Sequence, residues 1–320
     1  MRAFLGIDVG SVSTNIVVLN EDGSVHDALY LRTQGQPIKA VQDGLRQINK
    51  KYRDLIVRGV GTTGSARHLA GVVVGADSIK NEITAHALAA MHIVPDVRTV
   101  LEIGGQDSKI IIIRNGIVTD FAMNTVCAAG TGSFLDQQAA RLNIPIEQFG
   151  DIALQASAPV RIAGRCAVFA ESDMIHKQQT GHSASDILKG LCQALVRNYI
   201  SNVGKGKQIE GPILFQGGVA ANKGMKQAFE EALGCEVIIP PYFNVMGALG
   251  AALLAREEMK GKKDSAFRSF DVVDFVYNPR SFECSGCSNM CEIIEISING
   301  KVAARWGDRC GKWSNKETVA

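Results

Sequence analysis

Cysteines are the residues of this sequence whose type and spacing point most directly to chemistry. The chain of 320 residues contains eight of them, half spread through its body and half crowded near its end. The body cysteines are Cys127, Cys166, Cys192 and Cys235, and the end cysteines are Cys284, Cys287, Cys291 and Cys310. A thiolate is both a nucleophile and a ligand for zinc or iron–sulfur clusters, so each group requires an explanation.

Two of the body cysteines lie just before helix-like segments. Cys127 is in NTVCAAGTGSFLDQQ and Cys166 is in AGRCAVFAESDMI. Three interpretations are open: a nucleophile, metal ligands, or buried free thiols, since cysteine is among the residue types most often buried. The nucleophile is the weakest, because no histidine lies near either cysteine in the sequence. Cys192 falls on the apolar face of a helix and Cys235 at a helix-to-strand turn, and both are expected to be structural.

Three glycine turns form a second chemical pattern. The first glycine turn, Gly10–Thr14, follows Asp8 at a strand end; the second, Gly104–Asp107, follows another strand; the third, Gly217–Lys223, joins a strand to a helix. Glycine lets the backbone approach a phosphate closely, and successive N–H groups and hydroxyls cradle it. A carboxylate placed like Asp8 can hold magnesium, usually through water. One such turn is most often an ordinary hairpin, whereas three in this order favour a nucleotide site.

Strand-like and helix-like runs alternate along the chain, which predicts α/β layers. The strand pattern that begins near Arg2 returns near Thr99, so the chain contains a weak internal repeat. The segment PIKAVQDGLRQINKKY places Val41, Leu45 and Ile48 on one helix face. Further helices are expected in SIKNEITAHALAAMHIV, SASDILKGLCQALVRNYISNV, NKGMKQAFEEAL and VMGALGAALLAREEM, and KGKKDSAF is interpreted as a linker.

The composition is that of an ordinary globular protein, with 46% hydrophobic and 21% charged residues. A formal net charge of +2 gives no electrostatic case for binding nucleic acid or an anionic membrane. The first residues run directly into a strand, without the apolar core of a signal peptide, and no apolar run is long enough to span a bilayer. A cytoplasmic protein is therefore expected, in which the cysteines stay reduced.

The three glycine turns resemble the nucleotide motifs of the actin, hexokinase and heat-shock-chaperone ATPase superfamily. DVGSVST is similar to its first phosphate motif, EIGGQDSK to its second, and QGGVAANKGM to its adenosine motif. The resemblance implies two duplicated ribonuclease-H-like domains that clamp ATP. The first domain would be residues 1–97, completed by a helix at 245–258; the second would be 98–244, and 259–320 would form a linker and cysteine-rich tail.

The same resemblance implies a set of site residues. The nucleotide-binding residues would be Asp8, Gly10, Ser11, Ser13, Thr14, Gly104, Gly105, Gln106, Asp107, Gly217, Gly218, Val219, Asn222 and Lys223. NEITAHALAA resembles the Asn-Glu-Pro-Thr-Ala-Ala segment of the chaperones, which points to Glu82 as an organiser of water or metal. The usual Asp of the second phosphate motif is Glu102 here, so Gln106 and Asp107 are the first choices to position the attacking water.

A closer resemblance is to the ATP-dependent activators of 2-hydroxyacyl-CoA dehydratases, a family that includes the ATPase subunits of benzoyl-CoA reductase. It is carried by GIDVGSVST, GTTGSAR, IGGQDSK, NTVCAAGTGSFLD and AGRCAVFAESDMI, and it covers about Met1 to Arg256. It implies a homodimer that binds ATP and Mg²⁺ and holds one 4Fe–4S cluster between its subunits. Such a protein takes single electrons from ferredoxin or flavodoxin and delivers them to a dehydratase, an aryl-CoA reductase or a double-cubane reductase.

The physical properties of the two cysteines agree with that implication. A 4Fe–4S cluster needs four thiolates, of which Cys127 and Cys166 supply two, and a two-fold axis doubles any site placed on it. Both cysteines precede helices, whose N-termini carry partial positive charge and free N–H donors. Such ends would stabilise an anionic cluster.

The end cysteines have the spacing of a small metal-binding knuckle. Cys284, Cys287 and Cys291 are followed 19 residues later by Cys310, and ISINGKVAARW between them reads as a hairpin. The segment has too little apolar sequence to fold alone, so a metal would act as a staple. Zinc is the default for four cysteines and a second iron–sulfur cluster is the rival. Four unliganded thiols are the remaining possibility.

Two other functions compete with an electron-transferring ATPase. A small-molecule kinase of the same superfamily, acting on a sugar or carboxylate, would need neither Cys127 nor Cys166. A chaperone-like nucleotide switch would need a peptide-binding domain, and no such segment follows the ATPase-like region. Colour separates these possibilities, since only the first predicts a brown dimer that oxygen bleaches.

Overall fold

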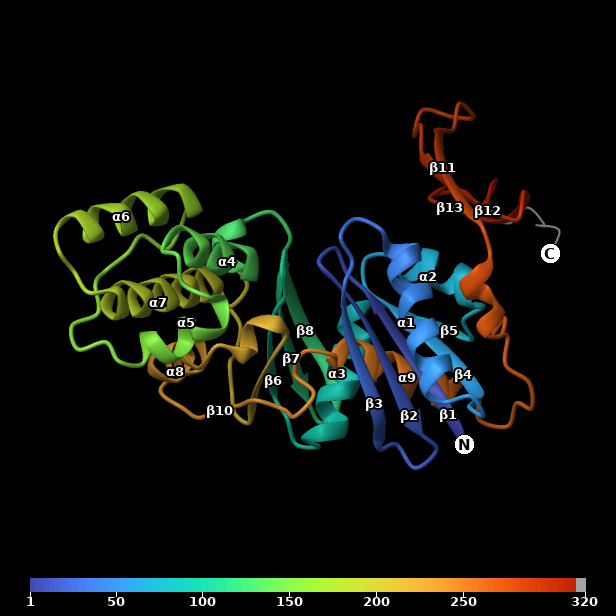
Figure 1. Cartoon of the computed structure of the whole chain (residues 1–320), viewed down its shortest axis with the longest axis horizontal. Helices are drawn as coiled ribbons and strands as arrows, with labels where there is room; N and C mark the ends of the chain where they lie inside the picture. The colour runs from blue at the N-terminus through green and yellow to red at the C-terminus, as the bar shows by residue number, and fades with distance from the viewer. Residues whose placement is uncertain (315–320) are drawn as a thin grey trace. The chain divides into compact units, whose positions relative to one another are not determined.

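The computed structural model describes residues 1–314 and contains two compact units (Figure 1). Unit 1 comprises Met1–Glu82 together with the chain from Gly247 onward, and unit 2 comprises Ile83–Met246. Each unit contains a five-stranded sheet, and a separate three-stranded sheet lies near the C-terminus. The predicted domain limits at residues 97 and 244 stay predictions.

The sheet of unit 1 has the order β3-β2-β1-β4-β5. Its strands are β1 (Arg2–Val9), β2 (Ser13–Asn20), β3 (Val25–Arg32), β4 (Ile56–Thr63) and β5 (Ser78–Ile79). The first three strands pair antiparallel, whereas β1, β4 and β5 pair parallel. The helices of this unit are α1 (Pro37–Lys51), α2 (Arg67–Val74) and α9 (Met246–Glu258).

The sheet of unit 2 repeats this path in the order β8-β7-β6-β9-β10. Its strands are β6 (Thr99–Ile103), β7 (Ser108–Arg114), β8 (Ile117–Asn124), β9 (Ile213–Gln216) and β10 (Val237–Ile238). Its helices are α3 (Glu82–Ile93), η1 (Ala128–Gly130), α4 (Gly132–Arg141), α5 (Ile146–Ala153), α6 (Ala167–Gln179), α7 (Ala184–Asn202), η2 (Gly218–Ala221) and α8 (Lys223–Leu233). Strand directions also match, so the α/β fold with two duplicated halves is confirmed.

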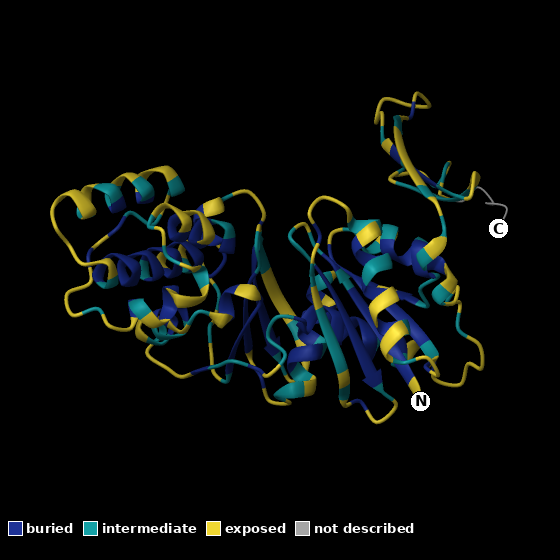
Figure 2. Cartoon of the chain, in the orientation of Figure 1, coloured by how far each residue is buried: buried dark blue, intermediate teal, exposed yellow. Residues whose placement is uncertain are grey.

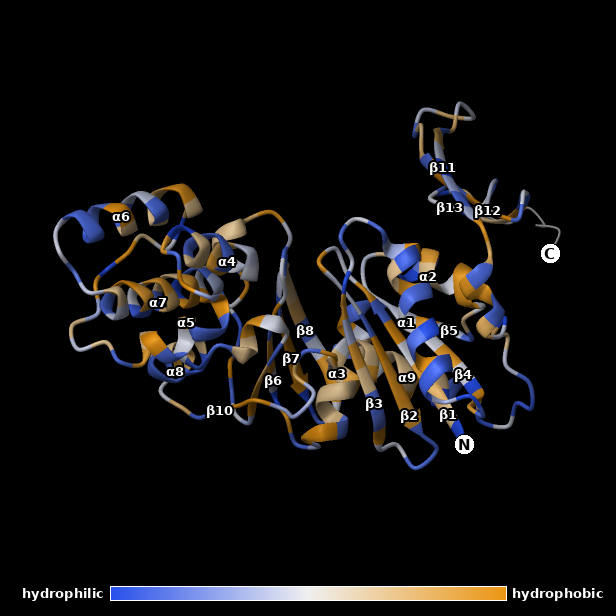
Figure 3. Cartoon of the chain, in the orientation of Figure 1, coloured by the Kyte–Doolittle hydropathy of each residue, from blue (hydrophilic) through white to orange (hydrophobic). Residues whose placement is uncertain are grey.

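Burial follows the hydrophobic pattern of the sequence (Figure 2). Strands β1 and β2 are buried along nearly their whole length, while the edge strand β3 is largely half-exposed. The predicted α1 stripe of Val41, Leu45 and Ile48 is buried, and charged residues occupy the other face (Figure 3). Within residues 1–314 no helix combines the length and apolar character needed to cross a membrane.

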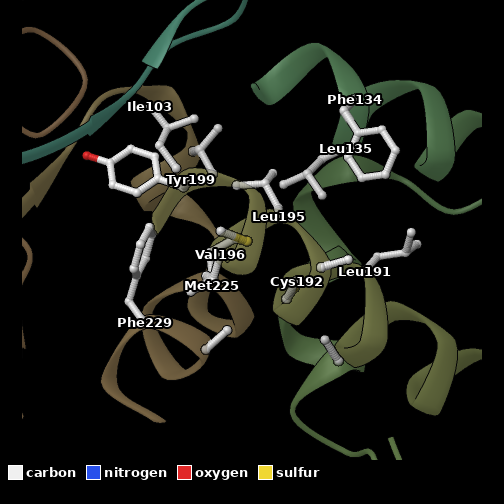
Figure 4. Packing of buried hydrophobic residues seen from close by; sticks show 14 of the residues in the cluster. Ile103, Phe134, Leu135, Leu191, Cys192, Leu195, Val196, Tyr199, Met225 and Phe229 are labelled. Atoms are coloured by element: carbon white, nitrogen blue, oxygen red, sulfur yellow. The ribbon is translucent and has the colours of Figure 1, made fainter. Parts of the chain in front are cut away.

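The core of unit 2 forms around α7 (Figure 4). Tyr199 on α7 packs edge to face against Phe229 of α8, and its hydroxyl donates to the backbone oxygen of Lys109. Cys192 on the same helix is fully buried, as predicted, and burial raises the pKa of its thiol to about 12. Cys235 lies at the predicted turn between α8 and β10 and is exposed, and its structural role stays a prediction.

Two short elements differ from the sequence prediction. Ser78–Ile79, expected to begin a helix, pairs as strand β5 with β4, and α3 begins only at Glu82. The helices α2 and α5 were not predicted; α2 has only eight residues, and its C-terminus is closed by Gly75 in the left-handed conformation.

The segment interpreted as a linker packs against unit 1. The Asp77 carboxylate accepts hydrogen bonds from the Ser265 hydroxyl and the Ala266 amide. Further along, the Gln42 side-chain amide contacts the backbone oxygens of Val272 and Phe275 around η3 (Phe270–Asp274). The segment KGKKDSAF, interpreted as a linker, is thus hydrogen-bonded to unit 1 through Ser265 and Ala266, and the linker assignment stays a prediction.

The tail folds as a small antiparallel sheet of β11 (Tyr277–Glu283), β12 (Glu292–Ile298) and β13 (Lys301–Trp306). The predicted hairpin is present, with positive φ at Asn299 and Gly300 in its turn. Across the strands, the buried Glu295 carboxylate accepts from Arg280 at 2.6 Å and from Arg305 at 2.7 Å. These hydrogen bonds lower the pKa of Glu295 and hold the three strands together.

We expect Gly6→Ala to lower the free energy of unfolding by about 2–3 kcal/mol, the cost of overpacking a well-filled interior. A Cβ at Gly6 on β1 would overlap the backbone oxygen of Ala248 and lie 2.8 Å from the Cβ of Ala252, both on α9. Urea unfolding of the nucleotide-free protein measures the change. Gly218→Ala is the control, since its Cβ would enter open space; equal stability of the two variants would contradict the close packing of β1 on α9.

Candidate nucleotide and thiol site

The first glycine turn is the connection between β1 and β2. The Gly10 amide donates to the Ser13 backbone oxygen at 2.9 Å, and Ser11 at its tip is exposed. Thr14 is fully buried and shares a hydroxyl hydrogen bond of 3.0 Å with Thr33. The turn therefore leaves Ser11 exposed and Ser13 half-buried, while Thr14 anchors it from inside.

Asp8 is half-buried at the end of β1, with its carboxylate against the backbone of Gly64. Gly64 has φ +90°, and a Cβ there would overlap both the Asp8 carboxylate and the Val9 backbone oxygen. Beside it, Asn15 Oδ1 and Thr63 Oγ1 are buried and make no hydrogen bond to the residues that the structure describes. A carboxylate with neighbouring buried oxygens fits a hydrated cation, the chemistry predicted for Asp8.

The second glycine turn repeats the first. The Gly104 amide donates to the Asp107 backbone oxygen at 3.0 Å, and Ile103 pairs with Ser108 as Val9 pairs with Thr14. By register, Glu102 takes the place of Asp8.

Lys109 takes the place of Asn15 and changes the electrostatics of this second copy. Its ammonium lies 3.0 Å from Glu102 and 2.9 Å from Asp107, and both Lys109 and Glu102 are buried. Glu102 is thus held in an ion pair. Gln106 is exposed and Asp107 is 32% exposed, so these two predicted catalytic groups remain accessible to solvent. Glu82, the third predicted catalytic residue, is the first residue of α3 and is half-buried.

The third glycine turn packs on the second. Gly217 has φ +88°, its amide donates to the Phe243 backbone oxygen at 2.7 Å, and a Cβ there would lie 2.7 Å from the Glu102 carboxylate. Asn222 caps α8 by accepting from the Met225 amide, and its side-chain amide nitrogen is buried without a partner in residues 1–314. Of the other predicted residues here, Gly218 faces open space, Val219 is buried, and Lys223 forms an exposed ion pair with Asp151.

Cys127 is the N-cap of η1, and two asparagines fix its surroundings. Asn124 Oδ1 accepts from the Cys127 amide at 2.9 Å, and Asn124 Nδ2 donates to the Cys127 backbone oxygen at 2.9 Å. Asn198 Nδ2 lies 3.8 Å from the Cys127 sulfur, which is 3.9 Å from the Arg165 backbone oxygen. The structure therefore brings Cys127 next to the residue that precedes Cys166.

Cys166 is the N-cap of α6 and, like Cys127, is half-buried. Large apolar side chains beside the two cysteines are exposed: Val126 is 96%, Val168 69% and Phe169 67% exposed. Within residues 1–314, no three side chains of the metal-binding types gather into a group that could hold a metal ion. One chain thus offers two half-buried thiols from neighbouring segments, with exposed apolar side chains beside them.

The second glycine turn and the Cys127 segment are joined by backbone hydrogen bonds. At the start of α4, the Gly132 amide donates to Gly104 O at 2.9 Å, and the Ser133 amide donates to Gly105 O at 2.9 Å. The Ser133 hydroxyl also donates to Gly105 O. Lys109, Asn124, Asn198 and Ser133 were not identified from the sequence, although Asn124 stands three residues before Cys127 in the same motif.

The end cysteines have different environments. Cys284 is buried and its sulfur accepts from the Trp313 indole N–H at 3.2 Å and from the Gly286 amide at 3.4 Å, which lowers its pKa. Cys291 is half-buried, and its backbone oxygen accepts from the Cys284 amide. Cys287 and Cys310 are exposed. A tail metal stays a prediction, with Cys284 the thiol best stabilised as a thiolate.

Known proteins resemble this chain over most of its length. A sequence model of the BadF/BadG/BcrA/BcrD ATPase family matches residues 5–255. The (R)-2-hydroxyglutaryl-CoA dehydratase activating ATPase of Acidaminococcus fermentans is 36% identical over 256 residues, which cover 78% of this chain and 96% of that protein. A benzoyl-CoA reductase subunit of Thauera aromatica is 30% identical over 269 residues, which cover 79% of this chain and 93% of that protein. All four end cysteines lie outside the family match.

Among solved structures, the activator of the 2-hydroxyisocaproyl-CoA dehydratase from Clostridium difficile with bound ADPNP is similar, with a TM-score of 0.73. It is 30% identical, and the likeness covers 81% of this chain and 96% of that one.

His86 makes unfolding pH-dependent in a predictable direction. It is buried, its Nδ1 lies 2.7 Å from Gln216 Nε2, and burial lowers its pKa to about 3. The unfolded chain binds the proton below about pH 6.5, whereas the folded protein does not until about pH 3, so stability falls as the pH is lowered.

Between pH 7 and pH 5 we expect His86 to reduce the free energy of unfolding by roughly 2 kcal/mol, a loss that His86→Gln should abolish. Urea unfolding at both pH values measures it. His26→Gln, which changes an exposed histidine, is the control and should keep the wild-type dependence. Identical pH dependence of the wild type and His86→Gln would show that His86 is not held neutral.

Proposed function

Because the chain belongs to the BadF/BadG/BcrA/BcrD ATPase family, we propose that it hydrolyses ATP and passes low-potential single electrons to a partner enzyme. The resemblance seen in the sequence motifs is confirmed at the level of the family. The partner would be of the 2-hydroxyacyl-CoA dehydratase or benzoyl-CoA reductase type, as the names of two relatives suggest, or of the double-cubane type. The electron donor would be ferredoxin or flavodoxin, in the cytoplasm.

The three glycine turns would bind ATP, with Mg²⁺ held through water by Asp8. Support comes from the relative solved with ADPNP and from the unpartnered buried oxygens of Asn15 and Thr63 beside Asp8. Gln106, Asp107 and Glu82 are proposed to position the attacking water. Hydrolysis of a phosphoanhydride needs mainly a positioned water and stabilised phosphate charge, which polar residues at such turns supply.

Cys127 and Cys166 would hold one 4Fe–4S cluster together with the same residues of a second copy. Cys166 lies at the N-cap of α6, where amides and the helix dipole favour negative charge, whereas Cys127 precedes the three-residue turn η1. Such a cluster, when bound, accepts and donates single electrons. The exposed side chains of Val126, Val168 and Phe169 supply apolar surface that a two-fold partner would cover, which supports a homodimer.

One observation supports a link between nucleotide binding and the surroundings of Cys127: the first turn of α4 is hydrogen-bonded to the second glycine turn. The segment that follows Cys127 therefore cannot keep its position if Gly104 and Gly105 move. A nucleotide that changes this turn would shift the helix behind Cys127 and alter the environment of the thiol. For one electron, about 1.4 kcal/mol of such work corresponds to roughly 59 mV.

The kinase alternative is less favoured, because the named relatives are activators and a component of a reductase. A kinase also has no use for the arrangement of asparagine side chains that fixes Cys127.

Anaerobic reconstitution of Cys127→Ala tests the proposal. The wild-type dimer should bind about four iron atoms with a brown colour, and the variant should lose nearly all of them because half of the ligands are removed. Iron analysis and the visible spectrum measure this, and ADPNP binding confirms that the variant is folded. Cys235→Ala, at an exposed cysteine outside the site, is the control. A full complement of iron in Cys127→Ala would contradict the proposal that Cys127 and Cys166 of two copies hold one cluster.

The tail metal is tested with Cys287→Ser/Cys310→Ser in the full-length chain, since truncation near residue 260 would remove Val272 from the core. If the tail binds zinc, the wild type should contain about one zinc per chain more than the variant, with equal iron. If it binds a second cluster, iron should differ instead. Equal zinc and equal iron in the two proteins would mean that the tail thiols hold no metal.

A further inference from the structure

A cationic pocket lies beside Cys127 and Cys166, entirely within unit 2. It has a volume of about 640 Å³ and is open to solvent. Its charged and polar walls are formed by Arg161, Arg165, Asp173, Lys177, Arg197 and Ser201. The residues come from three pieces of chain: the segment that leads to Cys166, helix α6 and the end of α7.

The walls of this pocket are held by specific hydrogen bonds. The Ala163 amide donates to Asp173 Oδ2 at 2.8 Å, which joins the segment to α6. Arg197 Nη2 donates to the Ile162 backbone oxygen at 2.6 Å, which joins it to α7. A Cβ on Gly164 would lie 2.8 Å from the Ala194 backbone oxygen, so the backbone itself is seated on α7. The shape of the pocket is therefore fixed by hydrogen bonds and close packing between its walls.

The pocket has an uncompensated positive charge. Arg161, Arg165, Lys177 and Arg197 face a single carboxylate, Asp173, and none of the four forms an ion pair with an acidic side chain in the described part of the chain. Burial and the nearby charge of Arg161 lower the pKa of Arg197, as expected for cations that lack anionic partners. Guanidinium groups bind carboxylates in paired hydrogen bonds, and an ammonium adds a point charge.

The pocket is physically continuous with the thiol site. Arg165 immediately precedes Cys166, and its backbone oxygen is 3.9 Å from the Cys127 sulfur. Asn198 Nδ2, the group that lies beside Cys127, also donates to the Gly164 backbone oxygen at 2.6 Å. A molecule seated in the pocket is therefore within a few residues of both thiols.

We propose that this pocket docks a carboxylate-bearing segment of the protein that donates electrons to this one. That the partner is an electron donor rests on the proposed function, whereas the preference for anionic groups rests on the pocket alone. The cations are spread over three walls and remain accessible, so they can meet several carboxylates of a protein surface. Complementary charge also accelerates and orients encounters, which suits a partner that must bind and leave repeatedly.

Arg161→Gln/Lys177→Gln tests the docking site, since neither side chain makes a hydrogen bond that holds the walls; Arg197 is left intact. The probe is a fluorescent hexaglutamate peptide, and its binding is followed by anisotropy at low salt. We expect about tenfold weaker binding by the double variant. Lys39→Gln/Lys50→Gln removes two exposed cations of α1 and should bind as the wild type. Equal binding by both double variants would overturn the proposal.

A competition arm identifies the source of the anion. Inorganic phosphate, pyrophosphate and free glutamate are compared as competitors of the peptide. If phosphate or pyrophosphate displaces the peptide at a lower concentration than glutamate does, and the pocket variant loses its affinity for phosphate as much as for the peptide, the pocket is a small-anion site and the docking proposal is contradicted. Peptide binding that phosphate does not reduce at matched ionic strength supports docking of a protein segment.

A reduction arm separates this inference from the proposed function. With reconstituted protein, Arg161→Gln/Lys177→Gln should retain its iron and its reduction by dithionite, while reduction by a purified ferredoxin slows about tenfold. Unchanged reduction by ferredoxin would overturn the docking role. A wild-type protein that binds no iron would overturn the proposed function instead, and the peptide arm, which needs no iron, would still decide on the pocket.

Discussion

The hydrogen bonds between the second glycine turn and the start of α4 are the constraint on which the candidate site depends. Amides in the first turn of a helix have no partner inside it, and here those of Gly132 and Ser133 are satisfied by Gly104 and Gly105. Loss of these bonds would leave polar groups of a buried helix start without partners. The second glycine turn and the segment after Cys127 are therefore joined, so the proposed phosphate-binding turn and the proposed cluster ligand share one structural support.

The two duplicated sheets provide the same scaffold for different electrostatics. In unit 1, the register positions around the turn hold Asp8 and Asn15; in unit 2, the same positions hold Glu102 and Lys109 as a buried ion pair. A buried pair stays favourable only while both partners are present, because one alone would be an uncompensated charge. In unit 2 the Glu102 carboxylate is thus paired with Lys109, and Asp107 is the acidic side chain of this turn that is accessible to solvent.

The sequence predicted what local patterns encode. Alternating strands and amphipathic helices predicted both sheets, and glycines marked each turn; at Gly217 the reason is steric, since a Cβ there would overlap the backbone oxygen of Ile103. What failed depended on tertiary contacts. Asn198 reaches Cys127 from 71 positions away, and Asp77 fixes Ser265 across 188 positions, so no spacing reveals either. The charged run after α9 reads as a linker in the sequence alone because its hydrogen-bond partners lie far away along the chain.

The surroundings of the two thiols combine two kinds of surface that suit two kinds of partner. Val126, Val168 and Phe169 are apolar and highly exposed, and apolar surface of this kind is characteristic of permanent interfaces, which a second copy of the chain would provide. The pocket that contains Arg161 and Lys177 is charged, and charged surfaces give fast association that salt weakens. The apolar surface and the charged pocket both lie next to Cys127 and Cys166, so the two proposed contacts, one with a second copy and one with an electron donor, would meet at the same thiols.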